Sequence, residues 1–347
     1  MAFLTLADVG RRLEPGGGKI ADMAELLSQT NAINDDMPWV QGNLPTGHMT
    51  TLRTAIVQGT FRRFYQGSPY TKTSGAQVTF ACAMLDDYSQ IDKKLANITD
   101  VAELREQEDI GHMEGMSQQV AGAMIYGNSI ANPAQFTGLA PYFSTVNSAL
   151  AQNATNVYDG GGTASANTSM WLIGWGESTI FGIFPHGSKA GLTFEDKGDV
   201  VPGFDANSNR FEAYTSYFSW DVGLCVRDWR YTVRCANLDT TTNAGGLAST
   251  TPPDLFVLLS KMVVALPTAG SKVSNITKSD AKDNIAPALK LRLYVNRTVR
   301  AYMDIQAIRN KQTLLTPREY AGMPVEDFRG VIVGVVDQIL NSEARVV

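Results

Sequence analysis

The sequence lacks any long apolar run, and this absence excludes a membrane-spanning helix. No stretch of about 18 apolar residues occurs in the chain, whereas a transmembrane helix needs about 20. The amino terminus, MAFLTLADVGRRLEPGGGK, also lacks a basic start followed by an apolar block. We therefore expect no membrane association and no secretory signal peptide, and we expect the chain to fold in the cytoplasm.

Cysteine and histidine are scarce. The chain has three cysteines, each in an apolar, strand-like segment: Cys82, Cys225 and Cys235. Because the number is odd and export is not expected, we predict free, buried thiols. The three histidines, His48, His112 and His186, are widely spaced, and neither Cys-x-x-Cys nor His-Glu-x-x-His occurs. We therefore expect no zinc site.

A surplus of positive charge is also missing. Lys and Arg total 29 against 34 Asp and Glu, which gives a net charge of −5. A general nucleic-acid binder needs a positive surplus to displace the counterions of the phosphates. The composition argues against such a binder, although it permits one face of the chain to lie near nucleic acid.

The usual motifs of catalysis are absent. Gly-x-Ser-x-Gly does not occur, and Gly16-Gly17-Gly18-Lys19 is no phosphate loop, since Leu13 stands where the first glycine is needed and Ile20 where a hydroxyl is needed. The carboxylate pairs Asp35-Asp36 and Asp86-Asp87 could form an acid/base pair or a weak calcium site. Neighbouring residues on a strand point to opposite faces, so we expect solvated turn or capping residues instead. We predict no catalytic residue, no cofactor and no metal.

The pattern of elements indicates an α+β protein. A content of 44% hydrophobic residues is enough for a sizeable core. After an irregular arm over residues 1–47, which could include a short helix in IADMAELLSQTNAI, an extended segment is expected from Thr50 to Phe64. A second strand follows, in which apolar residues alternate with polar ones: Ala76, Val78, Phe80, Cys82 and Met84.

These two strands predict a long hairpin without one consistently buried face. Arms of roughly a dozen residues at about 3.3 Å each would reach about 40 Å. A two-stranded hairpin of this kind is marginal in water. Something outside the hairpin must therefore cover it.

A long helix is expected after the hairpin. Thr99-Asp100 can cap its start, apolar residues recur at near-helical spacing from Val101 to Met124, and Gly127-Asn128 can end it. Its glycines, Gly111, Gly115 and Gly122, each cost about 1 kcal/mol relative to alanine, so packing must help to hold it.

In the remainder, strands and helices are expected to be segregated and not to alternate in βαβ units. We expect two strands around Gly176-Glu177, a strand pair in 211–235, a helix capped by Asp254, and a buried strand or pair in FRGVIVGVVDQIL. LKLRLYVN is typical of a strand, and NRTVRAYMDIQAIRN is typical of a helix.

Arginine and aromatic residues gather in the hairpin stretch QGTFRRFYQGSPYTKTS, at 58–74. Arg62 and Arg63 could bind phosphate, but this composition is also typical of the buried centre of protein interfaces, and the negative net charge favours a neighbouring subunit. The predicted interface residues are Arg53, Phe61, Arg62, Arg63, Phe64, Tyr65, Tyr70 and Lys72.

The order of arm, hairpin, long helix and α+β body resembles the major capsid protein of tailed bacteriophages, which has the Hong Kong 97-type fold. Three stretches are similar to the capsid family of short-tailed and related phages: DDMPWVQGNLPTGHMTTLRTAIVQGTFRRFYQG, WGESTIFGIFPHGSKAGLTFEDKGD and YVNRTVRAYMDIQA. Together they cover about a fifth of the chain directly, and the order of parts extends the likeness over most of it.

The resemblance implies a division of the chain. Residues 1–47 would be the N-terminal arm and 48–85 the extended loop, lying over an adjacent subunit. Residues 86–169 would form the peripheral domain with the spine helix 99–128. Residues 170–315 would form the axial domain, and 316–347 the strands that return to the peripheral domain.

The resemblance also implies function and partners. Such subunits form hexamers and pentamers that close into an icosahedral head around double-stranded DNA, so the expected location is the virion, after assembly in the host cytoplasm. A portal and a separate scaffolding protein are expected partners, a cement protein is a further one that the sequence leaves open, and the packaged DNA would be contacted non-specifically. Some relatives crosslink subunits through a loop lysine, but nothing around Lys72 supports that bond here.

Two alternatives remain at this stage. An encapsulin-type compartment shares the fold but encloses enzymes. An oligomeric enzyme could build a site between subunits from Asp86, Arg63 and His48.

Overall fold

The computed structural model describes residues 29–347, except 56, 99, 164, 199–200, 205–208, 244, 268–288, 310–315 and 321–322. Residues 1–28 of the expected arm, with most of its predicted helix, lie outside the described residues, as does Thr99.

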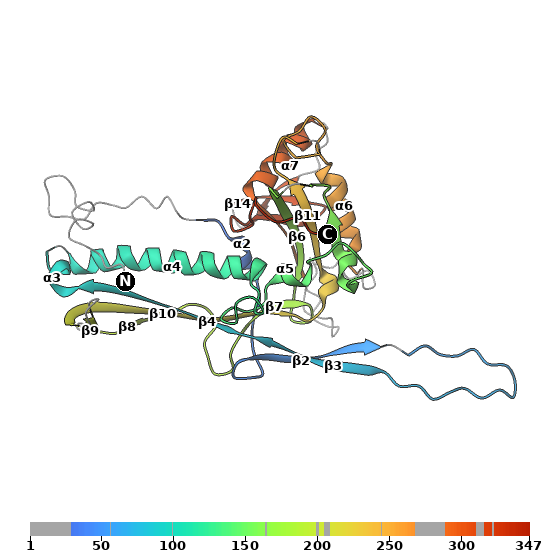
Figure 1. The fold of residues 1–347 in the computed structure, drawn as a ribbon, viewed down its shortest axis with the longest axis horizontal. Helices are drawn as coiled ribbons and strands as arrows, with labels where there is room; N and C mark the ends of the chain where they lie inside the picture. Colours follow the sequence, from blue (N-terminus) through green and yellow to red (C-terminus); the bar gives the residue numbers. More distant parts are fainter. Residues whose placement is uncertain are drawn as a thin grey trace.

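The molecule is elongated, with a compact body between two long extensions (Figure 1). Helix α4 and the strands beside it extend from the body in one direction. A hairpin of two strands, β2 and β3, extends in the other direction and ends in a long loop.

The helices follow their capping residues. The α-helices of the described residues are α2 Ala32–Asp36, α3 Lys93–Ala96, α4 Val101–Tyr126, α5 Leu139–Tyr142, α6 Leu255–Ala265 and α7 Arg297–Arg309, with 3₁₀ turns η1 Gln152–Asn156 and η2 Trp229–Tyr231. The Asp100 carboxylate accepts from the amides of Ala102 and Glu103 at the start of α4, and Gly127 follows its end. Asp254 caps α6 in the same way. The helices predicted over these segments are confirmed.

Most of the described strands join one mixed sheet. The bounds are β1 Trp39–Gln41, β2 Gly47–Ala55, β3 Ser74–Ala81, β4 Ala83–Asp92, β5 Val157–Asp159, β6 Asn167–Trp175, β7 Ile180–Phe184, β8 Thr193–Asp196, β9 Val201–Phe204, β10 Arg210–Val226, β11 Thr232–Asp239, β12 Lys290–Val295, β13 Thr316–Tyr320, β14 Met323–Phe328 and β15 Val331–Val335. The main path of the sheet is β13-β14-β15-β12-β6-β7-β10-β4, with β1, β5, β8, β9 and β11 attached beside it. Strands β2 and β3 form a separate two-stranded ribbon.

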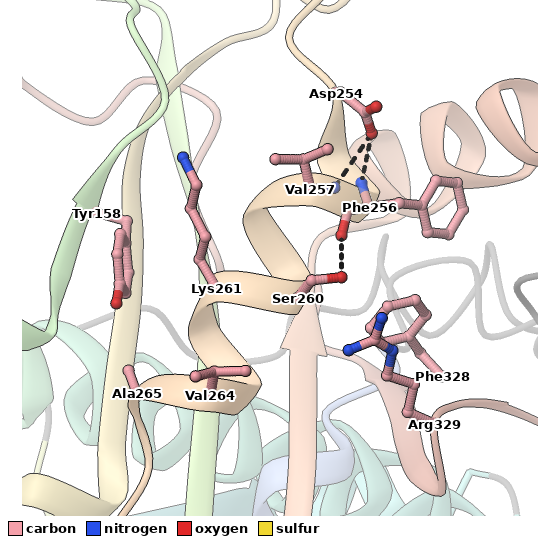
Figure 2. A pocket seen from close by; sticks show the side chains of 10 residues that line it. All are labelled: Tyr158, Asp254, Phe256, Val257, Ser260, Lys261, Val264, Ala265, Phe328 and Arg329. Carbon is pink, nitrogen blue, oxygen red and sulfur yellow. Dashed lines mark hydrogen bonds between the residues drawn. The ribbon is translucent and has the colours of Figure 1, made fainter.

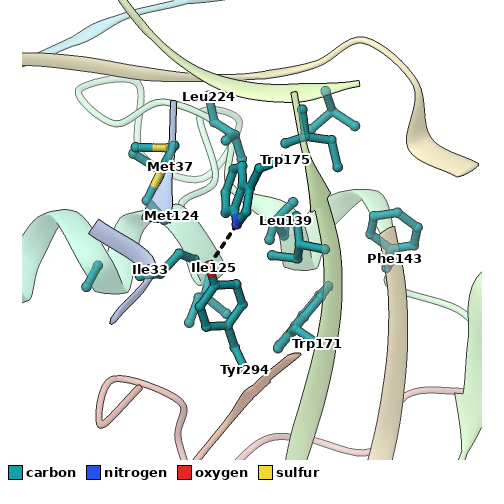
Figure 3. Packing of buried hydrophobic residues seen from close by; sticks show 14 of the residues in the cluster. Ile33, Met37, Met124, Ile125, Leu139, Phe143, Trp171, Trp175, Leu224 and Tyr294 are labelled. Atoms are coloured by element: carbon teal, nitrogen blue, oxygen red, sulfur yellow. Dashed lines mark hydrogen bonds between the residues drawn. The ribbon is translucent and has the colours of Figure 1, made fainter. Parts of the chain in front are cut away.

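The central strands bury both of their faces. Successive side chains of β6 point to opposite sides, so Trp171 and Trp175 pack in one core with α4 and α5. Met170 and Leu172 pack in a second core with α6 and α7. In the first core the indole of Trp175 donates to the Tyr294 hydroxyl at 2.7 Å (Figure 3). A strand with two apolar faces shows a continuous apolar run, as β6 does.

Strand β10 joins the body to the extension that carries α4. Its residues Ala213–Val222 pair antiparallel with β4, and Gly223–Val226 pair with β7. The same strand therefore belongs to both parts of the molecule, and α4 lies along the β4–β10 pair (Figure 1).

Three strand predictions need correction. The extended segment expected from Thr50 to Phe64 is a strand only as far as Ala55, because residues beyond it have no described strand partner. The two strands expected in 211–235 exist, but β10 and β11 pair with other strands and not with each other. The second hairpin strand also ends earlier than expected, at Ala81, and Ala83 begins β4 in the main sheet.

Candidate subunit interface

The β2–β3 ribbon carries a long loop, residues 57–73, here called the distal loop. The ribbon pairs in antiparallel register from Gly47–Ala81 to Ala55–Ser74. At the loop end of the ribbon, the Thr54 and Ser74 hydroxyls lie 3.0 Å apart. The ribbon thus fixes the positions of the two ends of the distal loop, while the loop itself extends far from the body (Figure 1).

The predicted interface residues are brought together on this ribbon and loop, and all are exposed. Phe61, Phe64, Tyr65 and Tyr70 have exposed fractions of 98% to 107%, so their rings contact almost nothing within the chain. Arg53, Arg62, Arg63 and Lys72 are exposed as well. Monomeric proteins rarely expose aromatic rings in such a group.

A tight turn shapes the tip of the distal loop. Tyr65 has a positive φ of 63°, and the amide of Gln66 donates to the carbonyl of Arg63 at 3.2 Å. The Gln66 side chain accepts from the Arg63 amide, and the Arg62 guanidinium donates to the Gln66 carbonyl, both at 3.3 Å. In the described part of the chain neither guanidinium lies in an ion pair, so both remain available to an external carboxylate.

The ribbon and loop are also basic, which the overall net charge concealed. Between Asp36 and Asp86 the sequence contains no acidic residue, whereas it contains Arg53, Arg62, Arg63 and Lys72. Counting charge by segment, and not over the whole chain, would have found this signal.

The remaining titratable candidates are dispersed. His48 on β2 packs edge-on against Phe181, and burial lowers its pKa. Asp86 on β4 accepts from the Tyr217 hydroxyl at 2.9 Å. With Arg63 bound to Gln66 at the tip, the structure does not bring the three residues of the enzyme alternative together within one chain.

Two carboxylates expected to be solvated or capping have specific partners. Asp36 accepts from Lys290 at 2.6 Å and Arg292 at 3.1 Å, so it joins α2 to β12 and the expectation is wrong for this residue. Asp87 contacts His112 at 2.6 Å, across from β4 to α4. Both partners lie far away in the sequence, which is why local spacing did not reveal them.

A hollow of about 630 Å³ beside α6 is lined mainly by apolar side chains (Figure 2). Two of its polar side chains bond within the helix: Asp254 caps the first turn and the Ser260 hydroxyl donates to the Phe256 carbonyl at 2.8 Å. Lys261 and Arg329 also line the hollow. The arrangement contains no nucleophile beside a base.

The three thiols are free, as predicted. Burial raises the pKa of Cys82 to about 11 and those of Cys225 and Cys235 to about 12. The thiols therefore stay protonated at neutral pH and are poor nucleophiles. Within the described residues no group of three or more His, Cys, Asp or Glu side chains could hold a metal ion. Of the helices described, none is long and apolar enough to cross a membrane.

Known proteins resemble the chain over nearly its whole length. Residues 15–347 match the family model of the major capsid protein GP7. A chain in the near-atomic structure of bacteriophage Epsilon15 is 30% identical, with a TM-score of 0.75, and the match covers 100% of this chain and 98% of that one. None of the curated proteins matches the chain.

More distant structures show weaker likeness. The capsid of bacteriophage JBD30 is 10% identical with a TM-score of 0.47 over 90% of this chain and 93% of that one. The capsid of a native GTA particle is 12% identical with a TM-score of 0.41 over 68% and 99%. The family model and the Epsilon15 structure, in contrast, each account for most or all of the chain, and the chain therefore belongs to the GP7 family of phage major capsid proteins, with a Hong Kong 97-type fold.

Proposed function

We propose that this capsid protein closes its shell through hexamers and pentamers in which the distal loop of each subunit lies on the next. One observation carries the proposal: four aromatic rings, from Phe61 to Tyr70, are fully exposed on the distal loop, which extends away from the body. Large aromatic side chains and arginines dominate the energy of protein interfaces when they are buried.

Burying the distal loop against a neighbouring subunit is expected to lower the free energy of the assembly. An isolated ribbon with a long loop is marginal in water. Each aromatic side chain can bury about 150–250 Å² on contact, which at about 25 cal/mol per Å² is a large favourable contribution. Covering the loop would offset the entropy that is lost when it becomes ordered.

The domain division follows the same reading. We assign residues 1–47 to an arm, 48–85 to the extended loop, and 86–169 with α4 to a peripheral domain. Residues 170–315 then form an axial domain, and 316–347 return to the peripheral domain. Strand β15 pairs with β12, which argues against the peripheral assignment for residues 331–335 and favours grouping them with the axial strands.

The proposal extends to partners. The role is structural, the shell encloses double-stranded DNA with non-specific contacts, and a portal and a separate scaffolding protein are the proposed partners in assembly. The likeness of the compared capsids gives the encapsulin alternative no support beyond the shared fold. For the enzyme alternative, His48, Asp86 and Arg63 do not meet within the described residues of one chain, and no observation supports their meeting between subunits.

Shortening the loop tests the proposal. Residues 56–73 are replaced by Asn-Gly, which closes a two-residue hairpin between Ala55 and Ser74. The expected result is a folded subunit, by circular dichroism and thermal unfolding, that sediments as a monomer while the wild type forms shells or capsomers. Shells of wild-type size from the shortened variant would contradict the proposal.

A further inference from the structure

Helix α6 is apolar almost all round. Of its 11 residues, Leu255–Ala265, all except a serine and a lysine are apolar. One face, with Leu259 and Met262, is buried in the second core. On the opposite face, Val257 and Val264 have exposed fractions of 48% and 74%. Because a helix that is apolar on every side is normally buried on every side, we expect the outer face of α6 to be covered by a partner.

The hollow of about 630 Å³ beside α6 runs along this outer face and is here called the α6 groove. Val257, Lys261 and Val264 follow one another at i, i+4 and i+7, so they form one stripe about 10 Å long. Tyr158 of β5 and the turn that follows Phe328 stand on opposite sides of the helix (Figure 2). A linear apolar stripe between two walls has the form that receives an amphipathic helix.

The α6 groove also carries positive charge that the subunit does not use. Lys261 and Arg329 line it, both are exposed, and neither lies in an ion pair within the described part of the chain. The carboxylate in the lining, Asp254, accepts from the amides of Phe256 and Val257 at the positive end of the helix. An incoming partner therefore meets apolar side chains and two cations, which select a partner with carboxylates.

The turn that Arg329 occupies does not explain an arginine. Phe328 pairs with Val331, so Arg329 and Gly330 form a two-residue hairpin turn between β14 and β15. Both have positive φ, 51° and 83°. Asn, Asp and Gly are the usual residues of such turns, because other side chains are strained there. The Arg329 guanidinium lies over the Phe328 ring, 5.5 Å from its centroid, and so it stays at the edge of the groove.

The size of the α6 groove favours a reversible partner over a second copy of the chain. A stripe of about 10 Å on a helix about 10 Å wide offers on the order of 100 Å². Stable subunit contacts bury about 800 Å² on each side. The groove is thus large enough for two or three turns of a docked helix and too small to hold two subunits together.

We propose that the α6 groove docks an amphipathic helix of a separate protein, with apolar side chains of that helix against Val257 and Val264 and its carboxylates beside Lys261 and Arg329. This inference goes beyond assembly through the distal loop and does not depend on it. It gives a partner to an apolar helix face that folding of the subunit leaves exposed.

A synthetic peptide is the probe. It is a fluorescein-labelled helical peptide of about 18 residues, with leucines at every third or fourth position and glutamates beside them. It should bind the unassembled wild-type subunit in fluorescence anisotropy. A peptide with lysine in place of each glutamate should bind at least about tenfold more weakly. Equal binding of the two peptides, or no binding of the acidic one, would overturn the proposal.

Arg329→Asn separates binding from folding. Because asparagine suits the turn, this variant should unfold thermally at the same temperature as the wild type or higher, and yet it should bind the acidic peptide more weakly. Unchanged affinity in this variant would remove Arg329 from the site.

A charge reversal tests direct contact. Lys261→Glu/Arg329→Glu should lose the acidic peptide and prefer the lysine peptide. The control Lys189→Glu/Arg345→Glu changes the net charge equally at exposed positions outside the groove and should bind as the wild type does. If the control loses the acidic peptide as fully as the groove variant, net charge alone explains binding and the proposal fails.

Assembly in the presence of the acidic peptide distinguishes a separate protein from a second copy. Wild-type subunits are assembled with the peptide, and the particles are collected by sedimentation. We expect the peptide to remain in the particles, since no copy of the chain fills the groove. Particles that exclude the peptide, or an assembly reaction that the peptide blocks, would show that a neighbouring copy covers α6 and would overturn the assignment to a separate partner.

Discussion

At the scale of single residues, Glu343 connects the C-terminal segment to the sheet. Its side chain is 4% exposed, and Oε2 accepts from the Arg234 guanidinium at 2.8 Å. The Tyr126 hydroxyl donates to Oε1, and Ser169 donates to the same carboxylate. Burial, together with the nearby negative charge, raises the pKa of Tyr126. The network holds α4, β6, β11 and the C-terminal segment in one arrangement.

Removing one partner of this buried pair should be costly. Glu343→Ala leaves the Arg234 guanidinium buried without its carboxylate, and the free energy of unfolding should fall by about 3–5 kcal/mol. Urea unfolding of the unassembled subunit measures it. The control is Arg230→Ala, which removes a side chain that is 60% exposed in its pair with Asp228, and it should cost less than about 1 kcal/mol. Equal losses in the two variants would refute the importance of the network.

The effect of Asp109 on the stability of the folded subunit should depend on pH. It lies on α4 and accepts from the Ser216 hydroxyl at 3.0 Å, and burial raises the pKa of its carboxyl despite the opposing effects of Ser216 and Arg105. A raised pKa in the folded state means that ionisation disfavours folding. The resulting loss of stability is absent below the ordinary value near 3.8 and develops as the pH rises through the folded pKa.

Asp109→Asn should therefore stabilise the subunit at neutral pH and not in acid. The difference between variant and wild type is measured by urea unfolding at about pH 7 and about pH 3, with a positive difference only at the higher pH. A variant that is less stable than the wild type at neutral pH would show that the ionised carboxylate contributes favourably.

Single residues were predictable where their partners are near in the sequence. Asp100 and Asp254 were recognised as caps because the amides they accept from follow within three residues. Asp36 was misjudged, and the partner of Asp87 was missed, because Lys290 and His112 approach them only through the fold.

At the scale of elements, the stability of helix α4 depends on the capping of its ends and on its packing against the core. Its glycines lower its intrinsic helix propensity by about 1 kcal/mol each. The Asp100 carboxylate accepts from the Ala102 amide at 2.9 Å and from the Glu103 amide at 3.5 Å. Near the other end of α4, Val120, Met124 and Ile125 are buried in the core (Figure 3).

Loss of this cap should be measurable. Asp100→Ala should lower the free energy of unfolding by about 1 kcal/mol, and Asp100→Asn by much less, since the amide oxygen can still accept. Thermal unfolding of the unassembled subunit provides the comparison. An alanine variant as stable as the asparagine variant would show that packing alone fixes the start of α4.

Helices were easier to predict than strand limits. The helices α4, α6 and α7 each show caps or apolar periodicity within one continuous segment. A strand ends where its partner ends, and the sequence from Ala55 to Phe64 has extended propensity but no described partner. The short strands β8, β9 and β13 were missed for the same reason, because pairing defines them.

At the scale of the whole molecule, the order of the strands in the sheet could not be predicted from local sequence patterns. Strand β10 pairs with β4 over Ala213–Val222 and with β7 over Gly223–Val226. No pattern in the sequence of residues 210–226 indicates this change of partner. The architecture came from the likeness of three stretches to a capsid family, which the match of residues 15–347 to the GP7 family model confirms.

The central claim is that the distal loop is covered by a neighbouring subunit. A cryo-electron microscopy reconstruction of assembled particles tests it most directly. The account expects residues 57–73 of each subunit to lie against the next subunit, with the rings of Phe61, Phe64, Tyr65 and Tyr70 buried at the contact. Particles in which the loops project into solvent, with all subunit contacts made elsewhere, would contradict it.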